Sequence, residues 1–156
     1  MTFAVDGFDG FMSFFELPAA DVPAEPGVYV VVRRADTTPV FLPVSPAGWF
    51  KGKDPTLPLA ELHAAWVPGE PVLYIGKAAA GQSGKRGLRK RLDEYRRHGA
   101  GQPVGHWGGR TIWQLADSAE LLVGWRTAAD SRAVEKAMIA DFVQMYGQRP
   151  FANRTG

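Results

Sequence analysis

The stretch VLYIGKAAAGQSGKRGLRKRLDEYRRHG, residues 72–99, decides most of the predicted fold. Residues 72–78 are apolar, with β-branched and aromatic side chains, which predicts a buried strand. The small residues and glycines that follow predict a flexible loop. Leu88, Leu92 and Tyr95 then lie at i, i+4 and i+7, which predicts a helix over 88–98 with these side chains facing inward. The stretch therefore predicts a strand, a loop and an amphipathic helix in succession.

The sequence before this stretch predicts one more strand and an insertion. Residues 27–33 (GVYVVVR) follow a proline and are rich in β-branched residues, so they predict a second buried strand. Residues 34–71 are rich in proline and predict a loop or short hairpin. Within them, LAELHAAW (59–66) predicts a short helix. The segment thus inserts between two predicted strands.

The sequence after the stretch predicts two strands and a long helix. RTIWQL (110–115) and LLVGWRTA (121–128) have the composition of strands. Thr127, followed three residues later by Asp130, matches a capping box, which predicts a helix from there to about Tyr146. Gly147 fits the C-cap of that helix. The element order predicts an α/β (α+β) fold: a small, mostly antiparallel sheet flanked by helices, in a single domain over residues 1–156.

Composition restricts the chemistry that this protein can perform. The chain has 156 residues and no cysteine, which excludes disulfides and thiolate metal sites. A metal bound mostly by oxygen ligands would be Mg²⁺ or Mn²⁺. No apolar run approaches the roughly 20 residues of a membrane span, and the N-terminal residues lack the basic start of a signal peptide. We therefore expect no membrane partner and a cytoplasmic protein.

Positive charge is concentrated in one segment. The formal net charge is +2, but residues 74–98 contain eight lysines and arginines and only two acidic residues, a local charge of +6. The rest of the chain therefore carries a charge of −4. A basic patch on an otherwise acidic protein favours an anionic partner. The alternative is a solvated helix face.

Two charged residues occupy inward positions on the predicted helices. Arg91 lies on the same stripe as Leu88 and Leu92, so it needs a carboxylate or a bound anion as partner. Both a structural salt bridge and a phosphate site satisfy this need. Glu135 begins the apolar stripe of the last helix. It can pair with Arg91, favour the positive helix end, or bind a hard metal ion.

These motifs together resemble the GIY-YIG nuclease family. GVY (27–29) and YIG (74–76) resemble the two halves of the motif that names the family. LRKRLDEY resembles the family's helix that carries an arginine, here Arg91, with Tyr95 four residues later. EKAMIADF resembles the helix with the metal-binding glutamate, here Glu135, and GQRPFAN resembles the segment that ends in an asparagine, here Asn153. The elements occur in the family's order over residues 27–33 and 72–153.

The resemblance implies a metal-dependent endonuclease that hydrolyses DNA phosphodiester bonds. Glu135 would bind one Mg²⁺ or Mn²⁺ ion that stabilises the leaving group, and Arg91 would hold the scissile phosphate. Tyr29 or Tyr74 would orient or deprotonate the attacking water. Lys77 and Arg91 would lower the pKa of such a tyrosine from its reference value of about 10.

The resemblance also implies supporting residues and a DNA contact surface. Tyr95 would support the phosphate or the water, and Asn153 would position the region around the glutamate. Five basic residues are expected to contact the DNA backbone: Lys85, Arg86, Arg89, Lys90 and Arg96. Two alternatives stay open, a catalytically inactive GIY-YIG-like module that binds DNA and a protein-interaction domain.

Two further features have more than one interpretation. His106 can approach the site as a proton carrier or can be a structural residue. Trp49, Phe50 and Trp66 are large apolar residues in the insertion, and they must pack on the domain, on DNA or on a second subunit. Because cutting two strands with one site is awkward, a homodimer is also expected. We expect the insertion to serve recognition or dimer contact.

Overall fold

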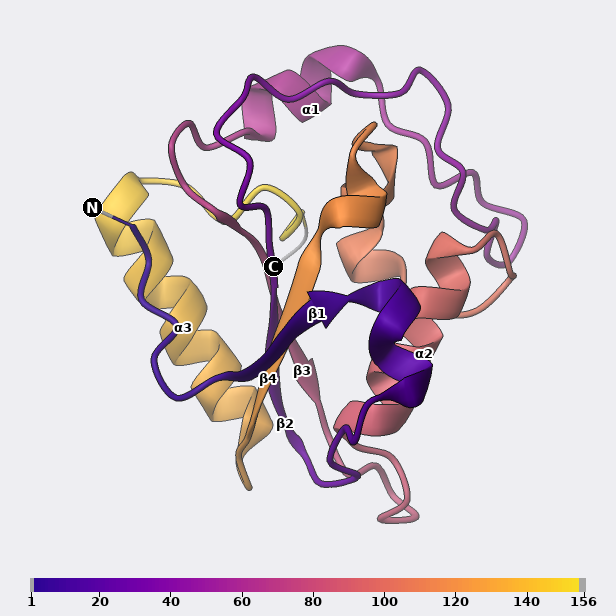
Figure 1. Ribbon diagram of the computed structural model, residues 1–156, viewed down its shortest axis with the longest axis vertical. Coiled ribbons are helices and arrows are strands. Elements are labelled where there is room, and N and C mark those ends of the chain that lie inside the picture. Colours follow the sequence, from indigo (N-terminus) through magenta and orange to yellow (C-terminus); the bar gives the residue numbers. More distant parts are fainter. Residues whose placement is uncertain (1, 155–156) are drawn as a thin grey trace.

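Four strands and three α-helices make up the regular structure of residues 2–154, which the computed structural model describes. In chain order the elements are β1 (Asp9–Ser13), the 3₁₀ helix η1 (Phe14–Ala19), β2 (Gly27–Val32), α1 (Leu59–Ala65), β3 (Val72–Ala78), α2 (Leu88–Gly99), the 3₁₀ helices η2 (Trp107–Gln114) and η3 (Ser118–Glu120), β4 (Leu122–Thr127) and α3 (Ser131–Tyr146). Figure 1 shows the sheet between α3 and α2.

The strands form one antiparallel sheet in the order β1-β4-β2-β3. This confirms the predicted fold class. Every residue of β2 is buried, as expected for a valine-rich central strand with a helix on each side. β3 lies at the edge of the sheet, so one side of its backbone has no neighbouring strand. The strand that carries YIG has no strand on this side, and the C-terminal segment binds its backbone there at Leu73 and Ile75.

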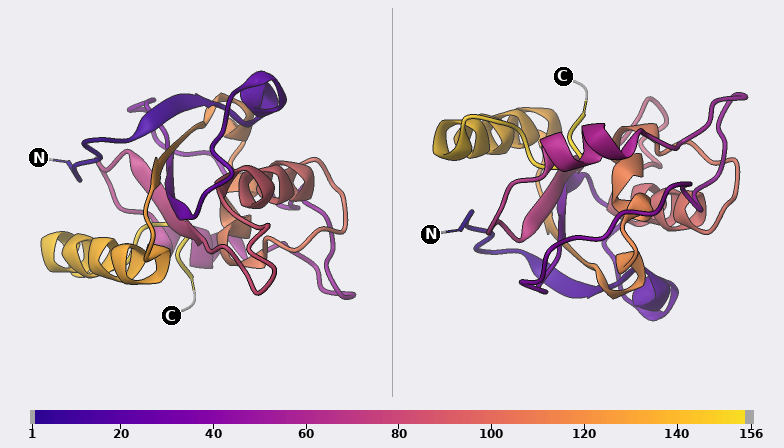
Figure 2. Two further views of the ribbon diagram at one scale, coloured as in Figure 1. Left: turned by 90° about the horizontal axis from the view of Figure 1, so that it is seen from below. Right: turned by 90° about the horizontal axis from the view of Figure 1, so that it is seen from above.

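The two faces of the sheet pack against different helices (Figure 2). Tyr29 and Val31 of β2 belong to the core cluster that contains Leu88, Leu92 and Tyr95 of α2. Val30 and Val32 of β2 belong to a second cluster, with Phe142 of α3. This alternation is the period of two expected of a strand. As a result, α2 and α3 lie on opposite faces and both reach the edge strand β3.

Two predictions about the strands are wrong. Of residues 110–115, predicted as a strand, 110–114 lie in the 3₁₀ helix η2 and Leu115 is its C-cap. The apolar residues Ile112 and Leu115 are buried in the core here. Their apolar character therefore reflects burial, and it does not require that they pair with a neighbouring strand. Conversely, β1 was not predicted. Gly10 and Phe11 have positive φ values of 89° and 59° and produce a register shift in this strand, so its sequence lacks simple alternation.

The predicted helices occur, with one correction to a cap. The N-cap of α3 is Asp130, whose carboxylate accepts a hydrogen bond from the Ala133 N–H at 3.1 Å. Thr127 is instead the last residue of β4, so the predicted capping box at this residue is wrong. Gly147 takes the left-handed conformation at the C-cap, as predicted. Among residues 2–154 no helix combines the length and the apolar character that a bilayer span requires.

The insertion over residues 34–71 is packed onto the domain. Leu62 of α1 is fully buried, and Phe41 stacks on Phe151 near the other end of the chain. Trp66 packs edge-on against the same Phe151 ring. Trp49 differs, because 57% of it is exposed. The expected contact of the insertion with DNA or a second subunit stays a prediction, and Trp49 is the exposed aromatic side chain of the three that is available for it.

Candidate active site at the free edge of β3

A pocket of about 720 Å³ lies where β3, α2 and α3 meet. Tyr74 and Lys77 enter it from β3, Arg91 from α2 and Glu135 from α3, and Asn153 closes it from the C-terminal segment. The edge position of β3 explains this meeting. Because the helices cover opposite faces of the sheet, their side chains come together only beyond its last strand. Five of the seven residues predicted to be catalytic therefore line one pocket.

Tyr29 and Tyr74 share the face of the sheet that is covered by α2, but only one of them borders the pocket. Tyr74 is 8% exposed and lines the pocket, whereas Tyr29 is 1% exposed and lies behind it. Tyr29 is directly opposite Gly76 in the β2–β3 ladder. An added Cβ at Gly76 would lie 2.4 Å from the Tyr29 ring, so this glycine provides the space for the tyrosine. Of these two tyrosines, Tyr74 is therefore the one that can contact a molecule bound in the pocket.

Arg91 is held by α2 at the border of the pocket. The N-cap of the helix is Gly87, whose φ of 140° and close approach to the Ala24 carbonyl admit no side chain. Arg91 donates to the Gly105 carbonyl at 2.7 Å and to the Glu94 carboxylate at 3.3 Å. Its side chain is 28% exposed, so it also faces the pocket. The salt bridge expected as one alternative is present, with Glu94 as partner.

Glu135 pairs with Lys77 and not with Arg91. The Lys77 ammonium lies 3.4 Å from the Glu135 carboxylate, and the glutamate side chain is 18% exposed. Lys77 is opposite Val28 in the ladder and so points to the α3 side of the sheet, where Glu135 lies. A partly exposed pair at this distance stabilises the fold by about 0–1 kcal/mol. The carboxylate can therefore exchange this partner at little cost.

Asn153 binds the backbone of the edge strand. Its side-chain oxygen accepts from the Ile75 N–H at 3.0 Å, and its amide nitrogen donates to the Ile75 carbonyl at 2.8 Å. The side chain thus takes the place of a neighbouring strand at Ile75, which lies between Tyr74 and Gly76. This placement gives Asn153 a role on β3, whereas the resemblance implied a role near the glutamate.

Tyr95 lies away from the pocket surface and contacts His106. Tyr95 is fully buried, and its hydroxyl donates to the Gly109 carbonyl at 2.6 Å. The Tyr95 and His106 rings stack at 3.5 Å with an angle of 6° between their planes. The Nε2 atom of His106 in turn lies 2.5 Å from the hydroxyl oxygen of Tyr29. Tyr95 therefore contacts a histidine, where the sequence suggested a phosphate or a water.

Burial keeps these side chains neutral. It raises the pKa of Tyr29 well above 10.0 and that of Tyr74 to about 12, although the charge of Arg91 lowers both. The prediction that Lys77 and Arg91 acidify a tyrosine is therefore wrong for the protein alone, because burial outweighs the charge. His106 shifts in the other direction, since burial and Arg91 both lower its pKa well below 6.5. All three groups are uncharged near neutral pH.

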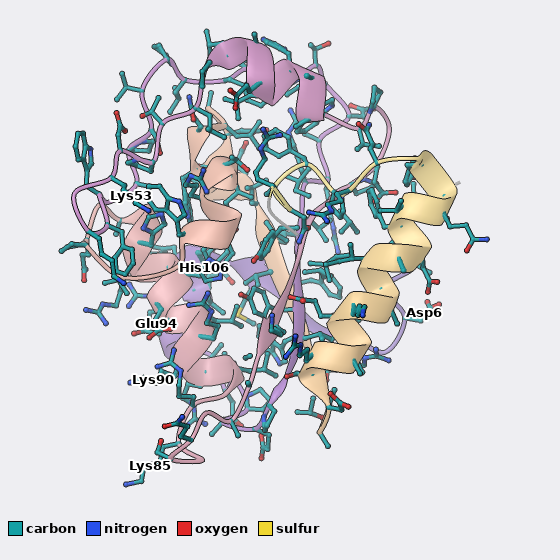
Figure 3. The ribbon with its side chains drawn as sticks, turned by 180° about the vertical axis from the view of Figure 1, so that it is seen from behind. Asp6, Lys53, Lys85, Lys90, Glu94 and His106 are labelled. Carbon is teal, nitrogen blue, oxygen red and sulfur yellow. The ribbon has the colours of Figure 1, made fainter. Side chains whose placement is uncertain are left out.

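The basic residues predicted to contact DNA differ in how free their charges are. Arg86 pairs with Glu94 at 2.5 Å, Arg96 with Asp93 at 2.7 Å, and Arg89 lies 3.8 Å from Asp21. Within residues 2–154, Lys85 and Lys90 have no ion pair. Figure 3 shows Lys85 at the tip of the loop before α2, with Lys90 and then Glu94 further along the helix. The available positive charge of α2 is thus smaller than its composition suggests.

Three further basic residues line the pocket and were not predicted: Arg132, Lys136 and Arg149. Together with Lys77 and Arg91 they surround Glu135, the single acidic residue among those lining the pocket. None of the three forms an ion pair with an acidic residue of the described chain. One sequence signal was available, because Arg132 lies three residues before Glu135 and so on the same helix face. The pocket is therefore strongly cationic.

The residues of the pocket fit a divalent cation that is bound jointly with a phosphate. Mg²⁺ commonly binds one or two carboxylates, substrate oxygens and water. Glu135 supplies one carboxylate that faces the pocket, and its partner Lys77 is displaceable. No group of three or more acidic, histidine or cysteine side chains suited to a metal occurs within residues 2–154. A metal here would thus depend on the oxygens of a bound anion.

Comparisons of the chain with family models, with curated proteins and with solved structures find no match. Membership of the GIY-YIG nucleases accordingly stays a prediction, based on the motif residues of segments 27–33 and 72–153. A functional proposal for this protein rests on those residues and on the pocket that they form at the free edge of β3.

Proposed function

We propose that this protein is a divalent-metal-dependent endonuclease that hydrolyses phosphodiester bonds in DNA. One observation carries the proposal: Arg91 and Glu135 come from helices on opposite faces of the sheet and meet in one pocket with Tyr74. Both charged residues stood out in the sequence because they occupy inward positions. A guanidinium and a carboxylate beside a hydroxyl are the groups that phosphodiester hydrolysis requires.

The roles follow from the chemistry of each group. Arg91 would bind the scissile phosphate, since a guanidinium matches two phosphate oxygens. Lys77, Arg132, Lys136 and Arg149 would attract the polyanion and offset its charge. Tyr74 would orient the attacking water from the wall of the pocket. Glu135 would hold Mg²⁺ or Mn²⁺, which when bound supplies stabilisation of the negative charge on the leaving oxygen.

The test is cleavage of supercoiled plasmid by the purified chain. We expect nicked or linear product with Mg²⁺ or Mn²⁺ and none with EDTA. Glu135→Gln should reduce the rate at least about 100-fold without loss of stability, because its ion pair with Lys77 is weak. Asp141→Asn is the matched control, since Asp141 is an exposed carboxylate on the same helix. Full activity of Glu135→Gln would refute the metal assignment.

A second pair of variants tests the arginine. Arg91→Ala should reduce cleavage per folded molecule by about 10²–10³, whereas Arg97→Ala, an arginine further along α2, should have little effect. The remaining outcomes distinguish the alternatives. DNA binding without cleavage at any metal concentration would support a catalytically inactive binding module. No binding to DNA even at low salt would support a protein-interaction domain.

A further inference from the structure

A buried histidine lies at the inner end of a line of hydroxyl groups that begins in the pocket. Tyr74 borders the pocket, and the ring of Tyr29 lies behind it, with the two ring centroids 6.0 Å apart. The Tyr29 hydroxyl then lies 2.5 Å from Nε2 of His106. Tyr29 and His106 are both shielded from solvent. The inner end of this line is therefore the imidazole of His106.

The surroundings hold the His106 ring in one orientation. It stacks on Tyr95, whose hydroxyl is fixed by the Gly109 carbonyl. An added Cβ at Gly109 would lie 2.4 Å from the Tyr95 hydroxyl and 3.1 Å from Cε1 of His106, so no side chain fits there. Arg91 binds the Gly105 carbonyl directly before the histidine. These contacts fix the orientation of the His106 ring, which packing alone does not require of a buried histidine.

The nitrogen atoms of His106 have different environments. Nε2 faces the Tyr29 hydroxyl, whereas Nδ1 has no hydrogen-bond partner among the described residues. A hydroxyl donates one proton and accepts through its lone pairs. When Nδ1 carries the imidazole proton, Tyr29 donates to Nε2, and its oxygen is free to accept from Tyr74. In this arrangement each donor of the line points inward, away from the pocket.

We propose that His106 orients the Tyr29 hydroxyl and accepts its proton when a water in the pocket is activated through Tyr74 and Tyr29. This inference rests on the proposed nuclease function. His106 acts through two tyrosines and does not touch the substrate, so it is a positioning residue. The tyrosine of the GVY segment is then a relay, and the proton comes to rest on a residue outside the GIY-YIG motif.

The transfer balances in atoms and charge. The attacking water gives a proton to the Tyr74 oxygen as its own oxygen bonds to phosphorus. Tyr74 gives its proton to Tyr29, and Tyr29 gives its proton to Nε2, so both tyrosines end neutral and His106 becomes an imidazolium. The bond from phosphorus to the leaving oxygen breaks, and that oxygen keeps the electron pair. The proton returns along the same line to solvent after the product leaves.

The charged and titratable groups around His106 make this acceptor dependent on substrate. The groups that face it are Tyr29 from β2, Tyr74 from β3, and Arg91, Tyr95 and His98 from α2. The positive charge of Arg91 opposes a second positive charge on the imidazole. A phosphate bound to Arg91 offsets that charge. The imidazole thus becomes a better acceptor when the pocket is occupied.

Two variants of His106 separate orientation from proton acceptance. His106→Phe keeps a ring to stack on Tyr95 but accepts nothing, so kcat for plasmid cleavage should fall by about 10²–10⁴ with KM unchanged. His106→Gln can accept a hydrogen bond from Tyr29 but not a proton, so its rate should be intermediate. Wild type should lose activity at acid pH, where His106 takes up a proton from solvent and can no longer accept one from Tyr29. Both variants should lack this loss of activity at acid pH (the acid limb). His63→Phe, at an exposed histidine of α1, is the control.

Stability and a direct spectroscopic measurement accompany the kinetics. Thermal unfolding and DNA binding in EDTA show whether each variant is folded. Nitrogen-15 NMR of the wild-type imidazole should show the proton on Nδ1 and Nε2 as the acceptor, and Tyr29→Phe should change the Nε2 shift. A proton on Nε2 in the free protein would overturn the proposal. So would an unchanged rate for His106→Phe, or full rate with an intact acid limb for His106→Gln. Absence of cleavage by wild type would instead overturn the nuclease function.

Discussion

Asn153 offers the sharpest separation of a structural role from a chemical one. Its side chain makes two hydrogen bonds with the backbone of Ile75, at 3.0 and 2.8 Å, on the free edge of β3. Each bond of this kind contributes about 0.5–1.5 kcal/mol net. Asn153→Ala should therefore lower the free energy of unfolding by about 1–3 kcal/mol, or roughly 2–4 °C in melting temperature per kcal/mol for a chain of this size.

The assay is urea unfolding followed by tryptophan fluorescence, paired with plasmid cleavage per folded molecule. Gln148→Ala is the matched control, because it removes an exposed amide from the same segment and should change stability by less than about 0.5 kcal/mol. Cleavage by Asn153→Ala should also fall, since Ile75 is flanked by Tyr74 and Gly76. If cleavage disappears while the free energy of unfolding is unchanged, Asn153 acts in the chemistry and the reasoning is wrong.

Three further predictions use the charges, the phenols and the packing of the site. Changing Lys85 and Lys90 to alanine should reduce the log–log slope of the salt dependence of DNA binding by about 0.9 per lost contact. Arg86→Ala should reduce the slope less, because Arg86 is already paired with Glu94 at 2.5 Å. Equal slopes would contradict this ranking. Burial raises the pKa of Tyr74 to about 12 in the folded protein, compared with about 10 in the unfolded chain. Its contribution to stability is therefore complete below about pH 10 and is lost as the pH rises toward 12. Urea unfolding midpoints across this pH range, together with phenolate absorbance, will measure the loss. Gly76→Ala should cost about 1–3 kcal/mol of unfolding free energy by overpacking, and an unchanged midpoint would show that the tyrosine ring moves freely.

The central strands and helices were predictable because their patterns are complete within each segment. β2 and β3 are runs of apolar residues next to turn signals, and α2 has its three apolar positions at helical spacing. β1 was missed since its positive-φ residues, Gly10 and Phe11, interrupt the alternation. Residues 110–115 were wrongly predicted as a strand, because strand-like composition reflects burial as well as conformation. Their 3₁₀ geometry depends on neighbours that a local pattern does not contain.

The sequence predicted which residues belong to the site, but not which groups those residues bind. Arg91 and Glu135 were found because each is charged on an apolar stripe. That Arg91 binds Glu94 and Gly105, and that Glu135 binds Lys77, depends on the helices lying on opposite faces of the sheet. The insertion packs on the domain through Leu62, which is one of the three alternatives that its apolar residues left open, and its expected role in recognition or dimer contact stays a prediction.

The covering of the β3 edge by the C-terminal segment has a consequence for the order of synthesis. Ile75 leaves the ribosome 78 residues before the asparagine that binds it. Until then, a nascent chain exposes the unpaired backbone of an apolar strand, the kind of edge that recruits other strands. Ala152 also donates to the Leu73 carbonyl, so one short segment closes two positions of that edge together. Chains that stop before this segment should aggregate more readily and lack an ordered pocket, which ties completion of the site to completion of translation through residue 153.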